Sequence, residues 1–199
     1  MEIEKEELEG LIFSPVTPGH WHHFQTLFGQ NGADGGCWCM WWRLPEKQFE
    51  EQAGEVNKAA MKGLIESGEV PGILAFSSRE PIAWCSVGPR EVFPALHRYW
   101  ELDKALDKKT WSIVCFFVEE KFRHRGLMKA LMQKAIEYAL SQGAEIIEGY
   151  PIEPQNEMTG FGGFTGIASV YKSFGFTENG RNARNEILMR YSREKTNFV

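Results

Sequence analysis

The second half of the chain contains three consecutive segments of different pattern. They are a β-favouring run, an amphipathic stretch bounded by glycines and a second apolar run. Residues 111–118 are rich in β-branched and aromatic side chains, which predicts a central strand. Residues 126–142 carry apolar side chains on one broad helical stripe, and Gly143 is a natural stop for that helix. Residues 144–150 again favour a strand. This order and spacing predict two parallel strands joined by a right-handed helical crossover.

Runs on both sides of this unit predict antiparallel neighbours. Residues 72–78 and 82–87 favour two strands around a proline-containing turn, which is the pattern of a hairpin. Further strands are expected near Phe176, over residues 187–191 and, more briefly, over residues 11–16. The sequence therefore predicts an α/β fold with a mixed, mostly antiparallel central sheet around a parallel strand–helix–strand core.

Three stretches outside the core predict helices. Residues 19–28 follow a Thr-Pro helix start, residues 45–67 open with Pro-Glu and end before a glycine, and residues 167–174 fit a short helix. No internal repeat, low-complexity tract or long polar linker divides the 199 residues. We therefore expect a single domain.

The formal net charge of the chain indicates which classes of binding partner are expected. The 27 acidic and 22 basic side chains give a formal net charge of −5. Neither nucleic acid nor an anionic membrane surface is expected as the main partner, whereas a cationic small molecule is favoured. No apolar run approaches the roughly 18 residues of a membrane-spanning helix, and the acidic first ten residues are unlike a secretory signal. These features predict a cytoplasmic protein.

The turn between the central strand and its helix is suited to an anion. Arg123, Arg125 and Gly126 lie where that helix begins. Backbone N–H groups in a first helical turn lack an intrahelical acceptor, and the helix dipole adds positive potential there. Gly126 lets a phosphate approach the backbone, and the arginines can add charge-assisted hydrogen bonds. The turn has neither Gly-x-Gly-x-x-Gly nor Gly-Lys-Ser/Thr, so a pyrophosphate held without a metal ion is expected.

The same turn resembles the pyrophosphate loop of the GNAT superfamily of acyl-CoA-dependent N-acetyltransferases. That loop reads Gln or Arg, two residues, Gly, one residue, then Gly or Ala; residues 123–128 read Arg-His-Arg-Gly-Leu-Met and differ at the last position. The resemblance implies acetyl-CoA as the acyl donor and no metal. It divides the domain, residues 1–199, into a divergent helical acceptor-side region over residues 1–68 and a CoA-binding core over residues 72–191. The cofactor site that it implies consists of Phe116, Phe117, Val118, Arg123, His124, Arg125, Gly126, Leu127, Met128 and Lys129.

A second match lies nearer the C-terminus. Residues 171–176, Tyr-Lys-Ser-Phe-Gly-Phe, resemble the family's tyrosine-containing helix and the Gly-Phe that follows it. The resemblance implies that an amine attacks the thioester directly, that backbone donors near Val118 polarise its carbonyl, and that Tyr171 protonates the leaving thiolate. Many relatives carry a glutamate on the central strand as the base, but here that strand contains no acid. Glu148 on the neighbouring strand is the first candidate for the base, and Glu91 is the second.

An aromatic, cysteine-containing loop precedes the second predicted helix. Trp38, Trp41 and Trp42 lie beside Cys37 and Cys39. In the resembling fold this segment borders the acceptor, so the three rings are expected either to form an aromatic wall that receives a small cationic amine or to pack as a satellite core. A metal site formed by the two cysteines and nearby histidines is a competing hypothesis. The histidines concerned are His20, His22 and His23.

Three functions remain open from the sequence. The leading one is transfer of an acetyl group from acetyl-CoA to the amine of an unidentified small molecule. The alternatives are a non-catalytic CoA-binding sensor or scaffold, and an enzyme that acetylates a protein amine. The sequence leaves open the acceptor, the acyl chain and the oligomeric state, with a homodimer as one alternative.

Overall fold

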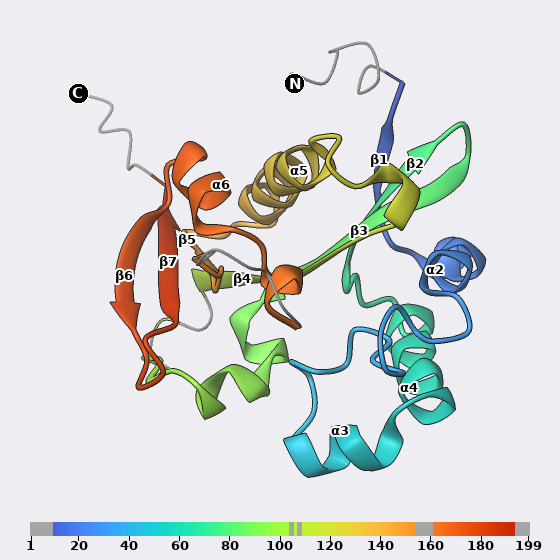
Figure 1. The fold of residues 1–199 in the computed structure, drawn as a ribbon, viewed down its shortest axis with the longest axis horizontal. Coiled ribbons are helices and arrows are strands. Elements are labelled where there is room, and N and C mark those ends of the chain that lie inside the picture. Colours follow the sequence, from blue (N-terminus) through green and yellow to red (C-terminus); the bar gives the residue numbers. More distant parts are fainter. Residues whose placement is uncertain (1–9, 104–105, 107–108, 154–160, 194–199) are drawn as a thin grey trace.

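The computed structural model describes residues 10–103, 106, 109–153 and 161–193. These residues form a seven-stranded sheet in the order β1-β2-β3-β4-β5-β7-β6 (Figure 1). Neighbouring strands run antiparallel except for the parallel pair β4–β5. The predicted fold class is therefore confirmed. The strands are β1 (Ile12–Pro15), β2 (Gly72–Ser77), β3 (Glu80–Pro89), β4 (Thr110–Val118), β5 (Ile146–Gly149), β6 (Thr177–Arg181) and β7 (Ile187–Ser192).

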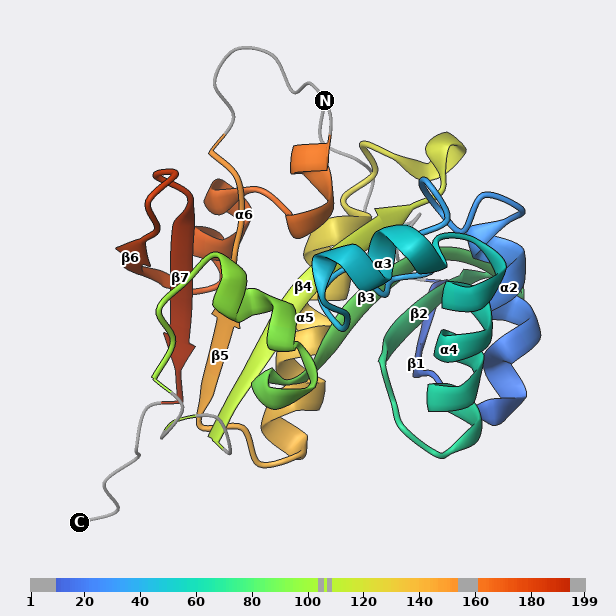
Figure 2. The same ribbon diagram turned by 90° about the horizontal axis from the view of Figure 1, so that it is seen from below.

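The helices and 3-10 turns divide between the two faces of the sheet (Figure 2). They are η1 (Pro18–His20), α2 (Trp21–Phe28), α3 (Glu46–Gln52), α4 (Glu55–Glu66), η2 (Arg90–Val92), η3 (Pro94–Arg98), η5 (Glu120–Phe122), α5 (Leu127–Ser141), η6 (Phe161–Thr165) and α6 (Ala168–Ser173). Side chains of α5 and α6 share one core cluster with one face of the sheet. The opposite face carries α2 and α4 over β2 and β3, and η2 and η3 beside them. None of the helices within the described ranges is long and apolar enough to cross a lipid bilayer.

Alternation along β2 shows how the sequence supplies both cores. Ile73 and Ala75 belong to the cluster under α5, whereas Leu74 and Phe76 belong to the cluster under α2 and α4. Successive side chains of a strand point to opposite faces, so a continuous apolar run fits a strand that is buried on both sides. The remaining predicted strands, and the helices other than the one expected over residues 45–67, are confirmed with small shifts at their ends.

The single helix expected over residues 45–67 is wrong, because two helices, α3 and α4, occupy this stretch. The chain turns at Gly54, which has a φ of 91°. The Gly54 N–H donates to the carbonyl oxygen of Gly36 at 2.9 Å, and Asn57 Nδ2 donates to the same oxygen at 3.3 Å. A Cβ on Gly36 would overlap the Gly54 backbone, so this close approach requires glycine. The break ties the cysteine-containing loop to the start of α4.

A β-bulge interrupts the pairing of β4 with β3. The register pairs Ile113 with Val87 and Cys115 with Ser86, so Val114 is an extra residue in β4. Because of the bulge, Val114 and Cys115 both contact the cluster beneath η2 and η3. The bulge thus turns a cysteine of an apolar strand towards the face that carries the helices of the N-terminal region.

The parallel strands separate just beyond their ladder. β5 pairs with residues 110–113 of β4 and ends at Gly149. The chain then leads to Ile152, which forms a bridge with Ile167, whereas β4 continues to Val118. The strands therefore diverge at their carboxyl ends, which is the edge where α/β sheets commonly bind ligands.

Replacing Gly149 by alanine is expected to destabilise this arrangement. A Cβ at Gly149 would overlap the ring of Tyr171, which packs on it from α6. Overpacking of this kind costs about 1–3 kcal/mol, so the free energy of unfolding measured by urea denaturation should fall by that amount.

Gly63→Ala is the matched control for that measurement. Gly63 lies within α4, and no described atom outside its own helix lies within 4 Å of the added methyl group. This substitution should raise the free energy of unfolding by about 0.5–1 kcal/mol, because glycine is unfavourable inside a helix. A Gly149→Ala protein as stable as the unsubstituted chain would contradict the packing described here.

Candidate active site

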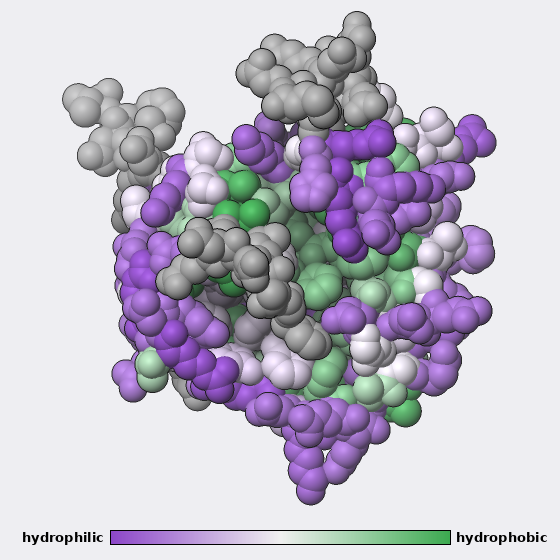
Figure 3. All heavy atoms as spheres, in the orientation of Figure 1, coloured by the Kyte–Doolittle hydropathy of each residue, from purple (hydrophilic) through white to green (hydrophobic). Residues whose placement is uncertain are grey.

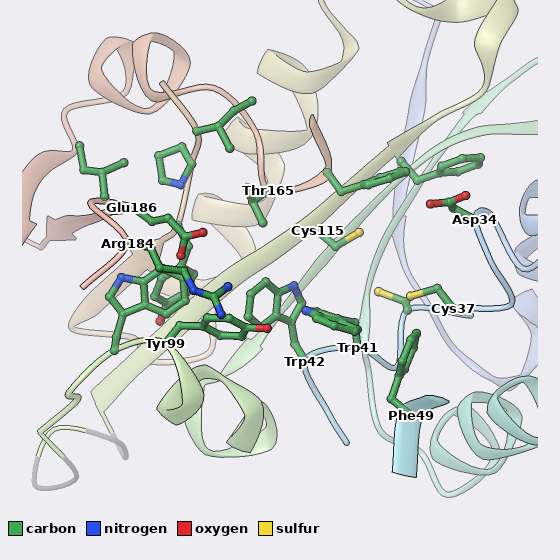
Figure 4. Close-up of a pocket in the computed structure, with 18 of the residues that line it drawn as sticks. Asp34, Cys37, Trp41, Trp42, Phe49, Tyr99, Cys115, Thr165, Arg184 and Glu186 are labelled. Atoms are coloured by element: carbon green, nitrogen blue, oxygen red, sulfur yellow. The ribbon is translucent and has the colours of Figure 1, made fainter. Parts of the chain in front are cut away.

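A cavity of about 650 Å³ lies where β4 and β5 diverge (Figure 4). Its volume is typical of small-molecule sites. Its walls come from the end of α2 and the loop after it, from α3, β4 and η6, and from the segments that follow η3, β5 and β6. On the face drawn in Figure 3, hydrophobic residues gather near the centre and hydrophilic residues surround them. The aromatic residues that line the cavity are Phe28, Trp41, Trp42, Phe49, Tyr99, Trp100, Phe117, Tyr150 and Phe164.

The three tryptophans of the N-terminal loop lie in two environments. Trp41 and Trp42 line the cavity, where their rings lie edge-on to Phe49 and Tyr99 at centroid distances of 4.9 and 5.7 Å. Trp38 is only 1% exposed and packs in the core between α2 and the sheet, outside the cavity lining. The structure therefore places two of the rings in the wall of the cavity and the third in the satellite core.

Carboxylates outnumber guanidinium groups in the cavity lining. The charged lining residues are Asp34, Glu46, Glu153, Glu186 and Arg184. Glu153 is paired with Arg181 at 2.8 Å. Asp34 comes from the glycine-rich loop after α2, and Figure 4 shows its carboxylate directed into the cavity. Glu46 lies 3.8 Å from a guanidinium nitrogen of Arg98, so two of the four lining carboxylates have guanidinium partners outside the lining, and Asp34 and Glu186 remain opposite Arg184.

The predicted pyrophosphate loop joins η5 to α5. Arg123, His124 and Arg125 are exposed on it. Gly126 is left-handed, with a φ of 75°, and its carbonyl accepts the first hydrogen bond of α5, from the N–H of Lys129. The N–H groups that precede Lys129 have no carbonyl one turn earlier in the helix. The loop thus combines helix N–H groups with exposed arginines, an arrangement that suits an anion.

Other residues of the predicted cofactor site lie on both faces of the sheet. Phe117 lines the cavity, whereas Phe116 and Val118 face the α5 side. Leu127 and Met128 pack in the same core cluster beneath α5. The Met128 side chain therefore packs the helix onto the sheet. The exposed surface of the loop consists of backbone groups and the side chains of residues 123–125.

Tyr171 lies directly behind the cavity wall. Its side chain is buried, and this burial raises the pKa of the phenol well above its usual range. Its hydroxyl donates a hydrogen bond to the carbonyl oxygen of Thr165 at 3.1 Å, and Thr165 lines the cavity. The phenol is therefore protonated at neutral pH and is one residue away from the cavity.

The two predicted bases do not present a carboxylate to the cavity. Glu148 is fully buried and outside the cavity lining; one of its oxygens accepts from Arg190 Nη2 at 2.7 Å, and the other accepts from Arg90 Nη1 and from the Tyr150 hydroxyl, each at 3.1 Å. Both oxygens are thus occupied by charge-assisted hydrogen bonds. Glu91 is exposed on η2, also outside the lining.

The residues of the alternative metal site do not come together. His20 and His23 pack their rings against Phe76, whereas Cys37 and Cys39 line the cavity. Within the ranges described, no three His, Cys, Asp or Glu side chains are grouped so as to hold a metal ion.

Several cavity residues were not identified from the sequence: Asp34, Phe49, Tyr99, Cys115 and Arg184. Asp34 had a local signal, since it is an acid in the loop just before the tryptophans. Cys115 had no local signal in the sequence, because it lies in an apolar strand where cysteine is expected to pack as a small hydrophobic residue. Only the bulge turns it towards the cavity. The others are distant in the sequence and meet only through the fold.

The sequence model of the acetyltransferase (GNAT) family matches residues 38–162, which include the aromatic loop, β4, the arginine-containing loop and α5. This chain belongs to the GNAT family. The resemblance expected from residues 123–128 is thereby confirmed, and so is the expectation of an N-acetyltransferase. No curated protein matches the chain in sequence.

Solved structures of GNAT proteins share this fold. The PaiA N-acetyltransferase of Thermoplasma acidophilum, in complex with coenzyme A, aligns with a TM-score of 0.53 and 12% identity, over 92% of this chain and 99% of that one. A GNAT acetyltransferase of Listeria monocytogenes aligns with a TM-score of 0.57 and 13% identity, over 92% of this chain and 95% of that one. The yncA protein of Salmonella typhimurium, with its cofactor acetyl-CoA, aligns with a TM-score of 0.56 and 13% identity, over 94% of this chain and 96% of that one. At these identities the likeness establishes the fold.

Removal of the Glu148 carboxylate is expected to cost stability. Glu148→Ala deletes the group that joins the guanidinium groups of Arg90 and Arg190 inside the GNAT sheet. Loss of one member of a buried ion network costs about 3–5 kcal/mol, which urea denaturation should reveal as a lower free energy of unfolding.

Glu145→Ala provides the comparison, because it removes an exposed partner of Lys109 from the same strand region. It should cost less than about 1 kcal/mol. If Glu148→Ala kept the stability of the unsubstituted chain and lost only acetyl transfer, the assignment of Glu148 to a structural network would be wrong and its role as the base would be restored.

Proposed function

We propose that this GNAT protein transfers an acetyl group from acetyl-CoA to the amine of a small cationic molecule. One observation carries the proposal: a single cavity joins the divergence of β4 and β5 to a wall of aromatic rings and carboxylates. The divergence offers a place for the thioester, and the wall offers a place for the amine. Holding both reactants in one cavity supplies the proximity that a direct transfer needs.

On the donor side, the loop before α5 holds the pyrophosphate of acetyl-CoA in this proposal. Arg123 and Arg125 contribute charge, and the first N–H groups of α5 contribute hydrogen-bond donors. The pantetheine arm then runs between β4 and the segment after β5, and brings the thioester to the bulge at Val114 and Cys115. A bulge leaves a backbone group outside the regular ladder, and an N–H there can stabilise the developing oxyanion.

On the acceptor side, aromatic faces and carboxylates favour a cation. Trp41, Trp42 and Tyr99 line one wall, and rings of this kind attract cations. The guanidinium groups of Arg98 and Arg184 already lie over Trp41 and Tyr99, at 5.2 Å from each ring centroid, so Trp42 is the ring that we assign to the amine. Asp34 is the carboxylate that we assign to the amine, since it points into the cavity and does not belong to the Glu148 network. It binds the ammonium form and accepts a proton on the way to the nucleophilic amine.

Tyr171 remains the proposed acid for the leaving thiolate. Burial keeps its phenol protonated, and its bond to the carbonyl of Thr165 orients the hydroxyl next to the cavity. Glu148 and Glu91 have no chemical role in this proposal. A CoA-binding sensor would bind acetyl-CoA without turnover, and a protein acetyltransferase would use peptides in preference to small amines.

Arg123→Ala is expected to weaken acetyl-CoA binding by about 10- to 100-fold in a calorimetric titration. The substitution removes one charge-assisted phosphate contact worth about 1.5–3 kcal/mol. Arg193→Ala is the control, because Arg193 is exposed beyond the end of β7 and its backbone pairs with Glu145, at the opposite end of the strands from the cavity. Equal affinities for the two variants would remove Arg123 from the cofactor site.

Asp34→Asn is expected to raise the KM for cationic amines by about tenfold or more, which corresponds to about 1.4 kcal/mol of lost attraction. The affinity for acetyl-CoA should stay unchanged. Glu50→Gln on α3 is the control, since Glu50 is exposed outside the cavity lining. Initial rates over a panel of cationic, neutral and anionic amines provide the readout. Turnover with anionic acceptors alone would overturn the substrate class, and binding of acetyl-CoA without any turnover would favour the sensor.

A further inference from the structure

The turn between β6 and β7 brings two opposite charges to the cavity. Arg184 and Glu186 both line the cavity, and both are exposed, so they lie at its rim. One side chain orders this turn: Asn182 Oδ1 accepts hydrogen bonds from the backbone N–H groups of Arg184 and Glu186, each at 2.9 Å. The two charged residues therefore start from a fixed backbone.

The guanidinium of Arg184 keeps its capacity to donate hydrogen bonds. It lies over the ring of Tyr99, with its central carbon 5.2 Å from the ring centroid. No hydrogen bond or ion pair joins this side chain to another residue in the part of the chain that the structure describes. A guanidinium carries five N–H donors in a planar fork that matches a carboxylate. Arg184 is thus a binding group for an anion.

The carboxylate of Glu186 is only partly occupied. Its Oε2 accepts a hydrogen bond from Asn182 Nδ2 at 2.6 Å. Between Glu186 and Arg184, as the structure describes them, there is no ion pair, so the two charges do not satisfy each other. A carboxylate has further acceptor sites, which suit an ammonium group. The rim therefore offers an anion-binding group and a cation-binding group two residues apart.

The α-carbon of a free amino acid carries the complementary pair of charges. Its carboxylate matches Arg184, and its ammonium group matches Glu186. An acceptor with only one of these charges leaves the other rim group without a partner, and such unmatched groups are a source of specificity. The rim thus favours an acceptor with both charges on neighbouring atoms.

A second cation-binding position lies away from this rim. In Figure 4, Asp34 lies at one end of the labelled lining and Arg184 at the other, with Trp41 and Trp42 between them. Trp42 packs edge-on to Tyr99 at a centroid distance of 5.7 Å, so a single ring separates Trp42 from the Arg184 guanidinium. An aliphatic chain that joins the two ends of a ligand would lie along these rings, as lysine stems lie along apolar surfaces.

We propose that the acceptor is a free basic amino acid, and that the acetyl group goes to the amine at the end of its side chain. The inference rests on the proposed function, because it assigns the acceptor of that reaction. Arg184 binds the α-carboxylate, and Glu186 binds the α-ammonium group. Asp34 and Trp42 bind the side-chain ammonium group. The acceptor carries two positive charges and one negative charge, which is the complement of Asp34, Glu186 and Arg184.

The transfer itself is that of the proposed function. The side-chain nitrogen forms an amide bond with the acetyl carbonyl carbon, and the bond from this carbon to the CoA sulfur breaks. The ammonium group loses two protons in all. One passes to solvent by way of Asp34, and the other replaces the proton that Tyr171 gives to the CoA sulfur. The products are free CoA and the amino acid acetylated on its side chain.

The test compares initial rates for three acceptors of matched chain length. They are lysine, 1,5-diaminopentane, which lacks the carboxylate, and 6-aminohexanoate, which lacks the α-ammonium group. The kcat/KM for lysine should exceed each of the other two by about tenfold or more, because each lacks one charge-assisted hydrogen bond. Ornithine, 1,4-diaminobutane and 5-aminopentanoate provide the same comparison for a chain that is one carbon shorter.

Fragmentation of the product in a mass spectrometer locates the acetyl group. We expect it on the side-chain nitrogen. An acetyl group on the α-nitrogen would overturn the inference, and so would equal kcat/KM values for the amino acid and its diamine in both series. Faster acetylation of a lysine within a peptide would also overturn it, because both α groups are then in amide bonds.

Two substitutions test the assignment of the rim charges. Arg184→Gln should remove the preference for lysine over 1,5-diaminopentane, and Glu186→Gln should remove the preference for lysine over 6-aminohexanoate. Both side chains are exposed, so neither substitution disturbs the core. Arg193→Gln, beyond the opposite end of β7, is the matched control and should keep both preferences. A preference for lysine over the diamine that survives Arg184→Gln would overturn the assignment.

The wider panel of amines separates this inference from the proposed function. Acetylation of other amines, but of neither lysine nor ornithine, would overturn the inference and leave the proposed function in place. A chain that binds acetyl-CoA and acetylates no amine of the panel would overturn both.

Discussion

The carboxylate of Glu148 holds together the segments that surround the cavity. It lies on β5 and accepts hydrogen bonds from Arg190 on β7, from Arg90 at the start of η2, and from Tyr150 in the cavity wall. The Tyr150 hydroxyl lies 3.1 Å from the hydroxyl of Ser112 on β4, so the network reaches both parallel strands. Burying such a network costs desolvation free energy, which its hydrogen bonds offset only when the partners are complete. The geometry of the cavity therefore depends on an interaction that takes no part in the proposed chemistry.

Two local irregularities in the sheet create the cavity that we propose as the active site. The bulge at Val114 brings Cys115 to the cavity, and the short ladder between β4 and β5 lets the strands separate beyond Gly149. Tyr171 fills the space next to Gly149, where a larger residue would not fit. The same few residues thus decide where a ligand can enter the sheet and which protein groups meet it.

Much of the fold follows from local patterns in the sequence. The strand, helix and strand over residues 111–150 were recognisable because their periodicities differ, and the arginine-containing loop because its chemistry is local. The break at Gly54 was not recognisable, since it depends on a hydrogen bond to Gly36 across a tertiary contact. The cavity was predictable only in part: Trp41 and Trp42 belong to a conspicuous cluster, whereas Asp34 and Cys115 are brought together by the bulge and by loop packing. The structural role of Glu148 could not be predicted, because its partners are 58 and 42 residues away in the chain.

The cavity wall is assembled from separate parts of the chain. The acidic side chains come from segments before β2 and after β5, and the aromatic side chains come from these segments, from the stretch after η3 and from β4, while the arginine-containing loop follows β4. The backbone hydrogen bonds of residues 122–126 run to neighbouring residues of the same loop and of α5, and none that the structure describes joins this loop to the acidic segments of the wall. Evolution can therefore alter one set of residues while the other is conserved, and a chain built in this way can exchange one acceptor for another without rebuilding its donor site.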